Sequence, residues 1–210
     1  MTVYLIWWPP KCGKTTLAKE LSKKLMIPWI SADTLQNIVY AYTPKKTHKK
    51  IFPNSQLRGD NNDETYSRHH HKAIIKWYIN QGKTSYKAIS MVAETYLIDK
   101  DDIVVEWYQV TPEIVEKIIK KFGKKNIQSI FLVKHDEKQF VKDIHKSTTP
   151  NDWIIRKTKE ENTFHKIAKM ISEYSKYFEK EARKHKFTVF TMDQDFKKQI
   201  KKAIQLLTKK

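Results

Sequence analysis

Residues 3–25, VYLIWWPPKCGKTTLAKELSKKL, decide how the rest of the chain is interpreted. They begin with an apolar run rich in β-forming residues, Val3–Trp8, which two prolines end, and this pattern predicts a buried strand. Leucines then recur every four positions, at Leu17, Leu21 and Leu25, and this spacing predicts a helix. The sequence therefore predicts a strand, a short loop and a helix in immediate succession.

The loop between the two elements predicts a phosphate-binding site. Gly13-Lys14-Thr15 fits the end of the Walker A pattern G-x-x-x-x-G-K-[ST], whereas Trp8 stands where the pattern has its first glycine. Backbone N–H groups of such a loop, and of the helix N-terminus behind it, form a nest for anions. The alternative is a helix that merely begins with a glycine turn and a threonine cap. We expect the nucleotide-binding residues to be Pro10, Lys11, Cys12, Gly13, Lys14, Thr15 and Thr16.

Strand-like and helix-like segments alternate through the rest of the chain. We expect further strands at about 28–31, 102–107, 127–133 and 187–191, and helices at about 64–80, 84–98, 113–122, 136–146, 164–182 and 196–207. This alternation predicts an α/β fold, a three-layer sandwich with a five-stranded, mostly parallel sheet. In such folds ligands bind beyond the carboxyl ends of the strands.

With this element order and with residues 9–16, the chain resembles P-loop kinases of the nucleoside-monophosphate kinase type. That group includes adenylate and shikimate kinases, zeta-toxin and chloramphenicol phosphotransferase-like kinases, and polynucleotide kinases. The resemblance implies a single domain of the P-loop NTPase type over residues 1–210, with an acceptor-binding insertion at about 35–80 and a lid at about 147–160. It also implies ATP and Mg²⁺, with Lys14 reaching the β- and γ-phosphates and the Thr15 hydroxyl ligating the metal.

Three further residues are candidates for the site, and each has a plainer alternative. Asp33 follows the second expected strand, where a carboxylate can orient an acceptor hydroxyl or take its proton, or can simply belong to a helix start. Glu106 ends an apolar strand, where it can hold Mg²⁺ together with Thr15, or form an ion pair. Arg156 lies in the expected lid, where it can clamp phosphates or remain a solvated charge.

Large aromatic residues occupy two positions where similar kinases have glycine. Trp8 replaces the first glycine of the Walker A pattern, and Trp107 directly follows Glu106, where a glycine often stands. If these rings fill the cleft, the chain is a kinase-like protein with impaired nucleotide binding. If they point into the core or stack on the base, the site is open. The sequence leaves both interpretations open.

Composition narrows the function classes. The chain has 41 Lys and Arg against 23 Asp and Glu, and this net charge of +18 raises nucleic-acid binding as an alternative. That alternative is not favoured, because the sequence holds no RNA-binding signature and no strip of interleaved aromatic and basic residues. A single cysteine, Cys12, excludes an internal disulfide framework. No apolar run is long enough for a membrane span and no basic signal-peptide region is present, so we expect a cytoplasmic protein without a membrane partner.

The leading hypothesis is an enzyme, an ATP- and Mg²⁺-dependent transferase that moves the γ-phosphoryl group of ATP to a small-molecule acceptor. Its catalytic residues would be Lys14, Asp33 and Arg156, and Thr15 and Glu106 would hold the metal. The alternatives are a P-loop protein with impaired nucleotide binding, a basic nucleic-acid-binding protein and a polynucleotide kinase. The sequence does not identify the acceptor.

Overall fold

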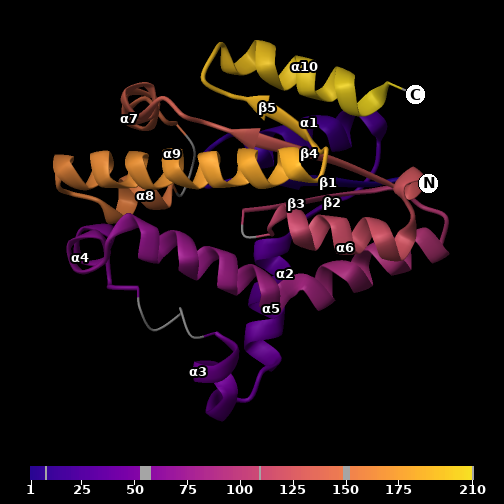
Figure 1. Cartoon of the computed structure of the whole chain (residues 1–210), viewed down its shortest axis with the longest axis horizontal. Coiled ribbons are helices and arrows are strands. Elements are labelled where there is room, and N and C mark those ends of the chain that lie inside the picture. Colours follow the sequence, from indigo (N-terminus) through magenta and orange to yellow (C-terminus); the bar gives the residue numbers. More distant parts are fainter. Residues whose placement is uncertain (8, 53–57, 109, 149–151, 210) are drawn as a thin grey trace.

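A five-stranded parallel sheet organises the chain (Figure 1). This computed structural model describes residues 1–7, 9–52, 58–108, 110–148 and 152–209. All neighbouring strands in the sheet run parallel, in the order β2-β3-β1-β4-β5. The strands are β1 (Val3–Trp7), β2 (Trp29–Ser31), β3 (Ile103–Trp107), β4 (Ile127–Val133) and β5 (Thr188–Thr191). The predicted α/β sandwich with a five-stranded sheet is confirmed, and its sheet is wholly parallel.

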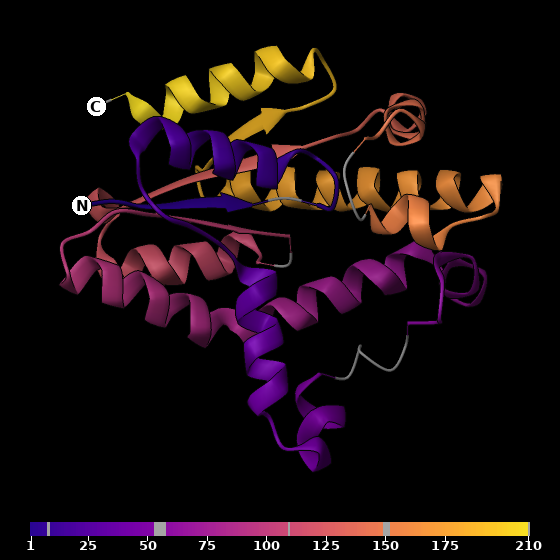
Figure 2. The same ribbon diagram turned by 180° about the vertical axis from the view of Figure 1, so that it is seen from behind.

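Helices cover both faces of the sheet. One face carries α1 (Lys14–Leu25) and α10 (Phe196–Thr208), which lie side by side in both views (Figure 1, Figure 2). The other face carries α5 (His71–Ile98), α6 (Pro112–Phe122) and α9 (Glu161–Lys184). The shorter elements are α2 (Ala32–Tyr42), η1 (Lys45–Thr47), α3 (His48–Ile51), α4 (Asn62–Arg68), η3 (Lys124–Asn126), α7 (Glu137–His145) and α8 (Trp153–Lys157). In the described part of the chain, no helix is long and apolar enough to cross a membrane.

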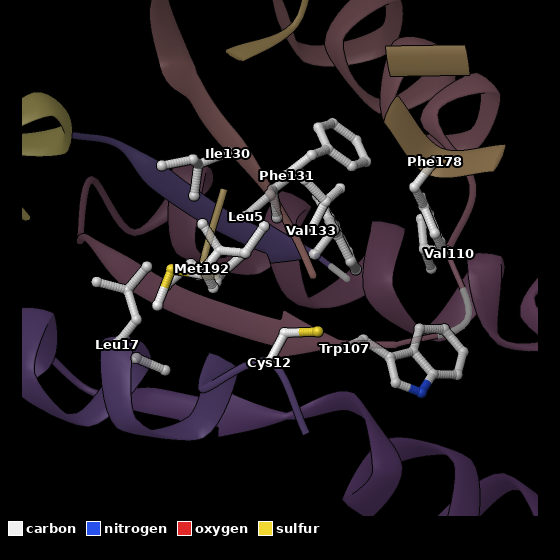
Figure 3. Packing of buried hydrophobic residues seen from close by; sticks show 14 of the residues in the cluster. Leu5, Cys12, Leu17, Trp107, Val110, Ile130, Phe131, Val133, Phe178 and Met192 are labelled. Carbon is white, nitrogen blue, oxygen red and sulfur yellow. The ribbon is translucent and has the colours of Figure 1, made fainter. Parts of the chain in front are cut away.

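The central strands are buried because helices cover both of their faces. All residues of β1 and β3 are buried, and both strands are apolar along their whole length apart from Glu106. The register aligns Trp7 with Trp107, and both indoles are fully buried. Figure 3 shows Trp107 in the same buried cluster as Cys12 and Phe178. Large aromatic rings therefore close the core at the carboxyl edge of the sheet.

Two local predictions are wrong. The sequence predicts separate helices at about 64–80 and 84–98, whereas α5 is one helix of 28 residues that passes through Gly82. A glycine costs a helix interior about 1 kcal/mol relative to alanine, but buried side chains on both sides of it, such as Tyr78 and Ile89, pack α5 against its neighbours. The second error concerns the expected lid, which is predicted as a loop but contains the short helix α8.

Candidate active site

A cavity of about 1110 Å³ opens at the carboxyl edge of the sheet. Its walls come from the loop after β1, the start of α2, the middle of α5, the segments that follow β3 and β4, and the loop between β5 and α10. Small-ligand pockets typically measure about 300–1,000 Å³, and this cavity lies just above that range. Of the residues that the sequence predicts for the site, those that line the cavity are Pro10, Lys11, Gly13, Lys14, Thr15, Thr16 and Asp33.

The loop between β1 and α1 presents the start of a helix to this cavity. Gly13 has a φ of 94° and a ψ of 10°, and Lys11 also has a positive φ, 67°. Helix α1 begins at Lys14 with no acidic residue in its first turn and, as far as the described residues show, no side-chain cap. Its first N–H groups and the positive end of its dipole are therefore left for an anion.

Thr15 and Glu106 form a hydrogen-bonded pair beside this loop. The Thr15 hydroxyl donates to Oε1 of Glu106 over 3.2 Å, and Nζ of Lys14 lies 3.6 Å from Oε2. Glu106 is 1% exposed, and its Oε2 has no hydrogen-bond partner within the described chain. A buried carboxylate needs a compensating cation, and in this arrangement Lys14 supplies it.

The same pair fits a magnesium ion. When Lys14 turns to a bound phosphate, the unpartnered oxygen of Glu106 becomes available to another cation. Mg²⁺ is bound through one or two protein oxygens and completes its shell with water and substrate phosphates. Thr15 and Glu106 offer such a set. The described residues contain no cluster of three or more His, Cys, Asp or Glu that would form an all-protein metal cage.

Asp33 brings a second carboxylate to the cavity. It lies in the first turn of α2, but Ser31 caps that helix by accepting the N–H of Asp33 over 3.3 Å. The carboxylate is thus left for other contacts, and its Oδ1 accepts a hydrogen bond from Nε1 of Trp107 over 3.1 Å. Burial raises the pKa of Asp33 above its ordinary value, while the positive charge of Lys14 opposes the shift. A cavity carboxylate with a raised pKa is suited to exchanging a proton.

One wall of the cavity consists of Arg58, Tyr78 and Tyr108. The sequence analysis did not predict that these three residues lie together. The guanidinium carbon of Arg58 lies 5.8 Å from the centre of the Tyr78 ring, and Tyr78 meets Tyr108 edge to face at a centroid distance of 5.3 Å. The pKa of Arg58 is raised above its ordinary value, mainly by Tyr78 and to a smaller extent by Tyr108. The guanidinium therefore stays charged. Arg58 falls within the predicted acceptor region, but no local pattern links it to the two tyrosines.

Helix α8 contacts the phosphate loop through an ion pair. Nζ of Lys11 lies 2.5 Å from Oδ2 of Asp152, whose side chain is 4% exposed. Asp152 also caps α8, and Trp153 lines the cavity. Arg156 is exposed on α8 and does not figure among the described residues that line the cavity. Its expected role on the phosphates requires α8 to move, and it stays a prediction.

Burial decides the role of the Trp107 ring, which the sequence leaves open, and it also characterises Cys12. The indole of Trp107 is fully buried and does not line the cavity, so this ring does not fill the space for phosphates. Trp8, the other ring at issue, lies outside the described residues. Cys12 is 1% exposed, and burial raises the pKa of its thiol to about 12. Cys12 is therefore a protonated, space-filling residue rather than a reactive thiolate.

Lys134 is a further basic residue of the cavity, to which the sequence analysis assigned no role. It directly follows β4, is 8% exposed and forms an ion pair with Asp143 of α7. The available signal was its position, because the carboxyl ends of parallel strands converge on the site. Asp193, which follows β5, also lines the cavity, and its carboxylate accepts backbone N–H groups of the segment after β4.

Comparisons with known proteins bear on the fold. No family model matches the sequence, and no curated protein matches it. Among solved structures, a shikimate kinase from Bacteroides thetaiotaomicron is 17% identical with a TM-score of 0.57, covering 98% of this chain and 96% of that one. A sugar kinase from Janibacter sp. is 11% identical with a TM-score of 0.54, covering 99% and 94%. A gluconokinase from Sinorhizobium meliloti is 12% identical with a TM-score of 0.52, covering 97% and 89%. The chain thus shares the fold of these kinase structures, which confirms the fold that the resemblance in its sequence implies.

Proposed function

We propose that the chain is an ATP-dependent kinase that transfers the γ-phosphoryl group to a hydroxyl group of a small, negatively charged acceptor. One observation carries this proposal: Lys14, Thr15 and Asp33 line one cavity beside the uncapped start of α1, and the buried Glu106 lies next to Lys14 and accepts the hydroxyl of Thr15. Each supplies a different part of what phosphoryl transfer needs. The similarity in fold to the shikimate, sugar and gluconate kinase structures supports the same class of reaction.

The proposed reaction assigns a role to each of these groups. The acceptor oxygen attacks the γ-phosphorus, the bond from that phosphorus to the β–γ bridging oxygen breaks, and ADP leaves. The acceptor proton passes to Asp33, which releases it to solvent after turnover. Lys14 leaves Glu106 and neutralises charge on the phosphates, while the N–H groups at the start of α1 bind phosphate oxygens. Mg²⁺, held by Thr15 and Glu106, would offset the negative charge of the phosphates.

The position of Arg58 indicates that the acceptor carries a negative charge. Its guanidinium lies close enough to Asp33 to lower the pKa of that carboxyl, and two tyrosines hold it in the cavity wall. Arginine binds carboxylate and phosphate groups through two parallel hydrogen bonds. We therefore expect the acceptor to be a hydroxy compound that also carries a carboxylate or a phosphate.

Titration calorimetry with ATP and Mg²⁺ tests the phosphate loop. Lys14→Ala should lower ATP affinity at least tenfold, or about 1.4 kcal/mol, and leave the fold intact. Lys19→Ala is the matched control, because Lys19 lies on the same helix, is exposed and does not line the cavity. Wild-type affinity in the Lys14 variant would overturn the proposed function.

A screen for ADP release tests the acceptor class. The screen uses small hydroxy compounds in pairs, with and without a carboxylate or phosphate group. We expect turnover with the charged member of a pair, and a raised KM for that acceptor in Arg58→Ala with little change in the KM for ATP. Turnover that prefers the uncharged members would remove Arg58 from the acceptor site.

A second candidate function, nucleic-acid binding, is favoured by the lysines of α1 and α10. The two helices lie side by side, and their exposed lysines have no carboxylate within ion-pair distance in the described structure. These lysines are Lys19, Lys23, Lys24, Lys197, Lys198, Lys201 and Lys202. On α6 and α9, by contrast, several lysines pair with glutamates, as Lys117 does with Glu113. Binding of duplex DNA or RNA that falls by orders of magnitude between about 50 and 200 mM salt would support this candidate, and absence of binding at low salt would exclude it.

A further inference from the structure

Trp107 and Trp7 are matched in position but differ in one contact. They are aligned across β3 and β1, and both are fully buried. The Nε1–H of Trp107 donates to Oδ1 of Asp33 over 3.1 Å, whereas Nε1 of Trp7 has no partner within the described chain. The two rings therefore share size, burial and sheet layer, and one of them holds a carboxylate of the cavity.

The bond to Trp107 restricts how the carboxylate of Asp33 can turn. The backbone of Asp33 is set by the Ser31 cap at the start of α2, but the terminal torsion of an aspartate is otherwise broad. Because Oδ1 is bound to a ring that is anchored in β3, the oxygen left for a ligand in the cavity is Oδ2. Figure 3 shows the indole nitrogen directed away from the labelled core side chains. The strand end that provides Glu106 thus also sets the direction of the second carboxylate.

We propose that Trp107 is a positioning residue, whose indole N–H orients Asp33 so that Oδ2 faces the acceptor hydroxyl. This inference rests on the proposed role of Asp33 and deepens it. Trp107 is fully buried and acts through Asp33 rather than by touching a substrate.

Replacing each tryptophan by phenylalanine provides a matched kinetic test. Both variants keep an aromatic ring and lose the same volume, but only Trp107→Phe loses a hydrogen bond to Asp33. We expect Trp107→Phe to lower kcat by roughly tenfold or more, as for a lost hydrogen bond to a charged group, with the KM for ATP nearly unchanged. Trp7→Phe should keep a kcat close to that of the wild type. Equal kcat values in two folded variants would overturn the positioning role.

A second measurement does not depend on turnover or on the stability of the phenylalanine variants. The chain has six tryptophans, so the ¹H–¹⁵N spectrum of the folded wild-type chain contains six indole N–H signals to assign. Asp33→Ala should shift the signal of Trp107 and leave that of Trp7 in place. An unmoved Trp107 signal would overturn the inference while the proposed function stands. If the signal shifts but the wild-type chain binds no ATP and phosphorylates no acceptor, the proposed function is overturned. The contact between Trp107 and Asp33 would then have no catalytic role.

Discussion

Replacing Gly13 by alanine tests the phosphate loop at its tightest point. Gly13 has a φ of 94°, and placing an L side chain in the left-handed region costs roughly 1–2 kcal/mol. The added Cβ would also lie 2.3 Å from Cε2 of Phe196. The Phe196 side chain is 42% exposed and can turn toward solvent, so the overlap can be relieved while the backbone strain cannot. A substitution at Gly13 therefore has two separate costs, the backbone strain and the overlap with Phe196.

We expect Gly13→Ala to lower the free energy of unfolding by about 1–2 kcal/mol from strain alone, which corresponds to roughly 2–4 °C in Tm for each kcal/mol in a domain of this size. The affinity for ATP should fall as well, because the N–H groups of the nest turn away from the anion. Urea denaturation and calorimetry with ATP and Mg²⁺ measure the two effects on the same samples. In a Phe196→Ala background the overlap is gone, so the change at Gly13 should then cost only the strain.

Gly123 provides the control for this prediction. It also has a positive φ, 87°, but with an extended ψ of 139°; it lies after α6, and its added Cβ would meet nothing closer than Nδ2 of Asn126 at 3.9 Å. Gly123→Ala should therefore also lose stability through backbone strain, with no loss of ATP affinity. If Gly13→Ala were as stable as the wild type, the left-handed conformation of the loop would be refuted. If both glycine variants weakened ATP binding equally, the effect would not come from the loop.

Two further predictions concern charges in the cavity. Asp33→Asn should lower turnover far more than ATP affinity, and it should raise stability near neutral pH. Burial places the pKa of the folded state above that of the unfolded state, so ionised Asp33 costs stability at high pH, and this cost disappears as the pH falls through the raised pKa. Urea denaturation at neutral and acidic pH should show the gain shrinking on acidification, and a constant gain would contradict the raised pKa. Asp152→Asn should keep the cap of α8 but release Lys11, so calorimetry should show tighter ATP binding, and unchanged affinity would exclude Lys11 from phosphate contact.

The central part of the site was predictable because its signals are local. A strand, a Gly-Lys-Thr loop and a leucine-spaced helix follow one another; β1 begins at the predicted Val3, and α1 contains the three leucines that predict it. Asp33 and Glu106 were identifiable for the same reason, since each stands at the carboxyl end of an apolar strand. In parallel sheets these ends converge, so position along the chain predicts position in space.

The wall of Arg58, Tyr78 and Tyr108 was not predictable from local patterns. Its members come from three different segments, and the packing of α5 against α2 and the sheet brings them to the same cavity. Gly82 hides the continuity of α5 in the sequence, because glycine is unfavourable in helices. Tertiary packing overrides that preference, and the sequence alone does not reveal by how much.

The tryptophan after Glu106 suggested a blocked site because the two residues are adjacent in the sequence. Both lie in β3, however, and a strand directs neighbouring side chains to opposite faces of the sheet. Glu106 reaches Thr15 of α1 on one face, whereas Trp107 is aligned through Trp7 with Phe131, whose ring lies 6.1 Å from that of Phe178 in α9 on the other face. The alternation thus removes the ring from the phosphate side and leaves its N–H at the strand end, within reach of Asp33. A large residue at position 107 is therefore compatible with an open phosphate site.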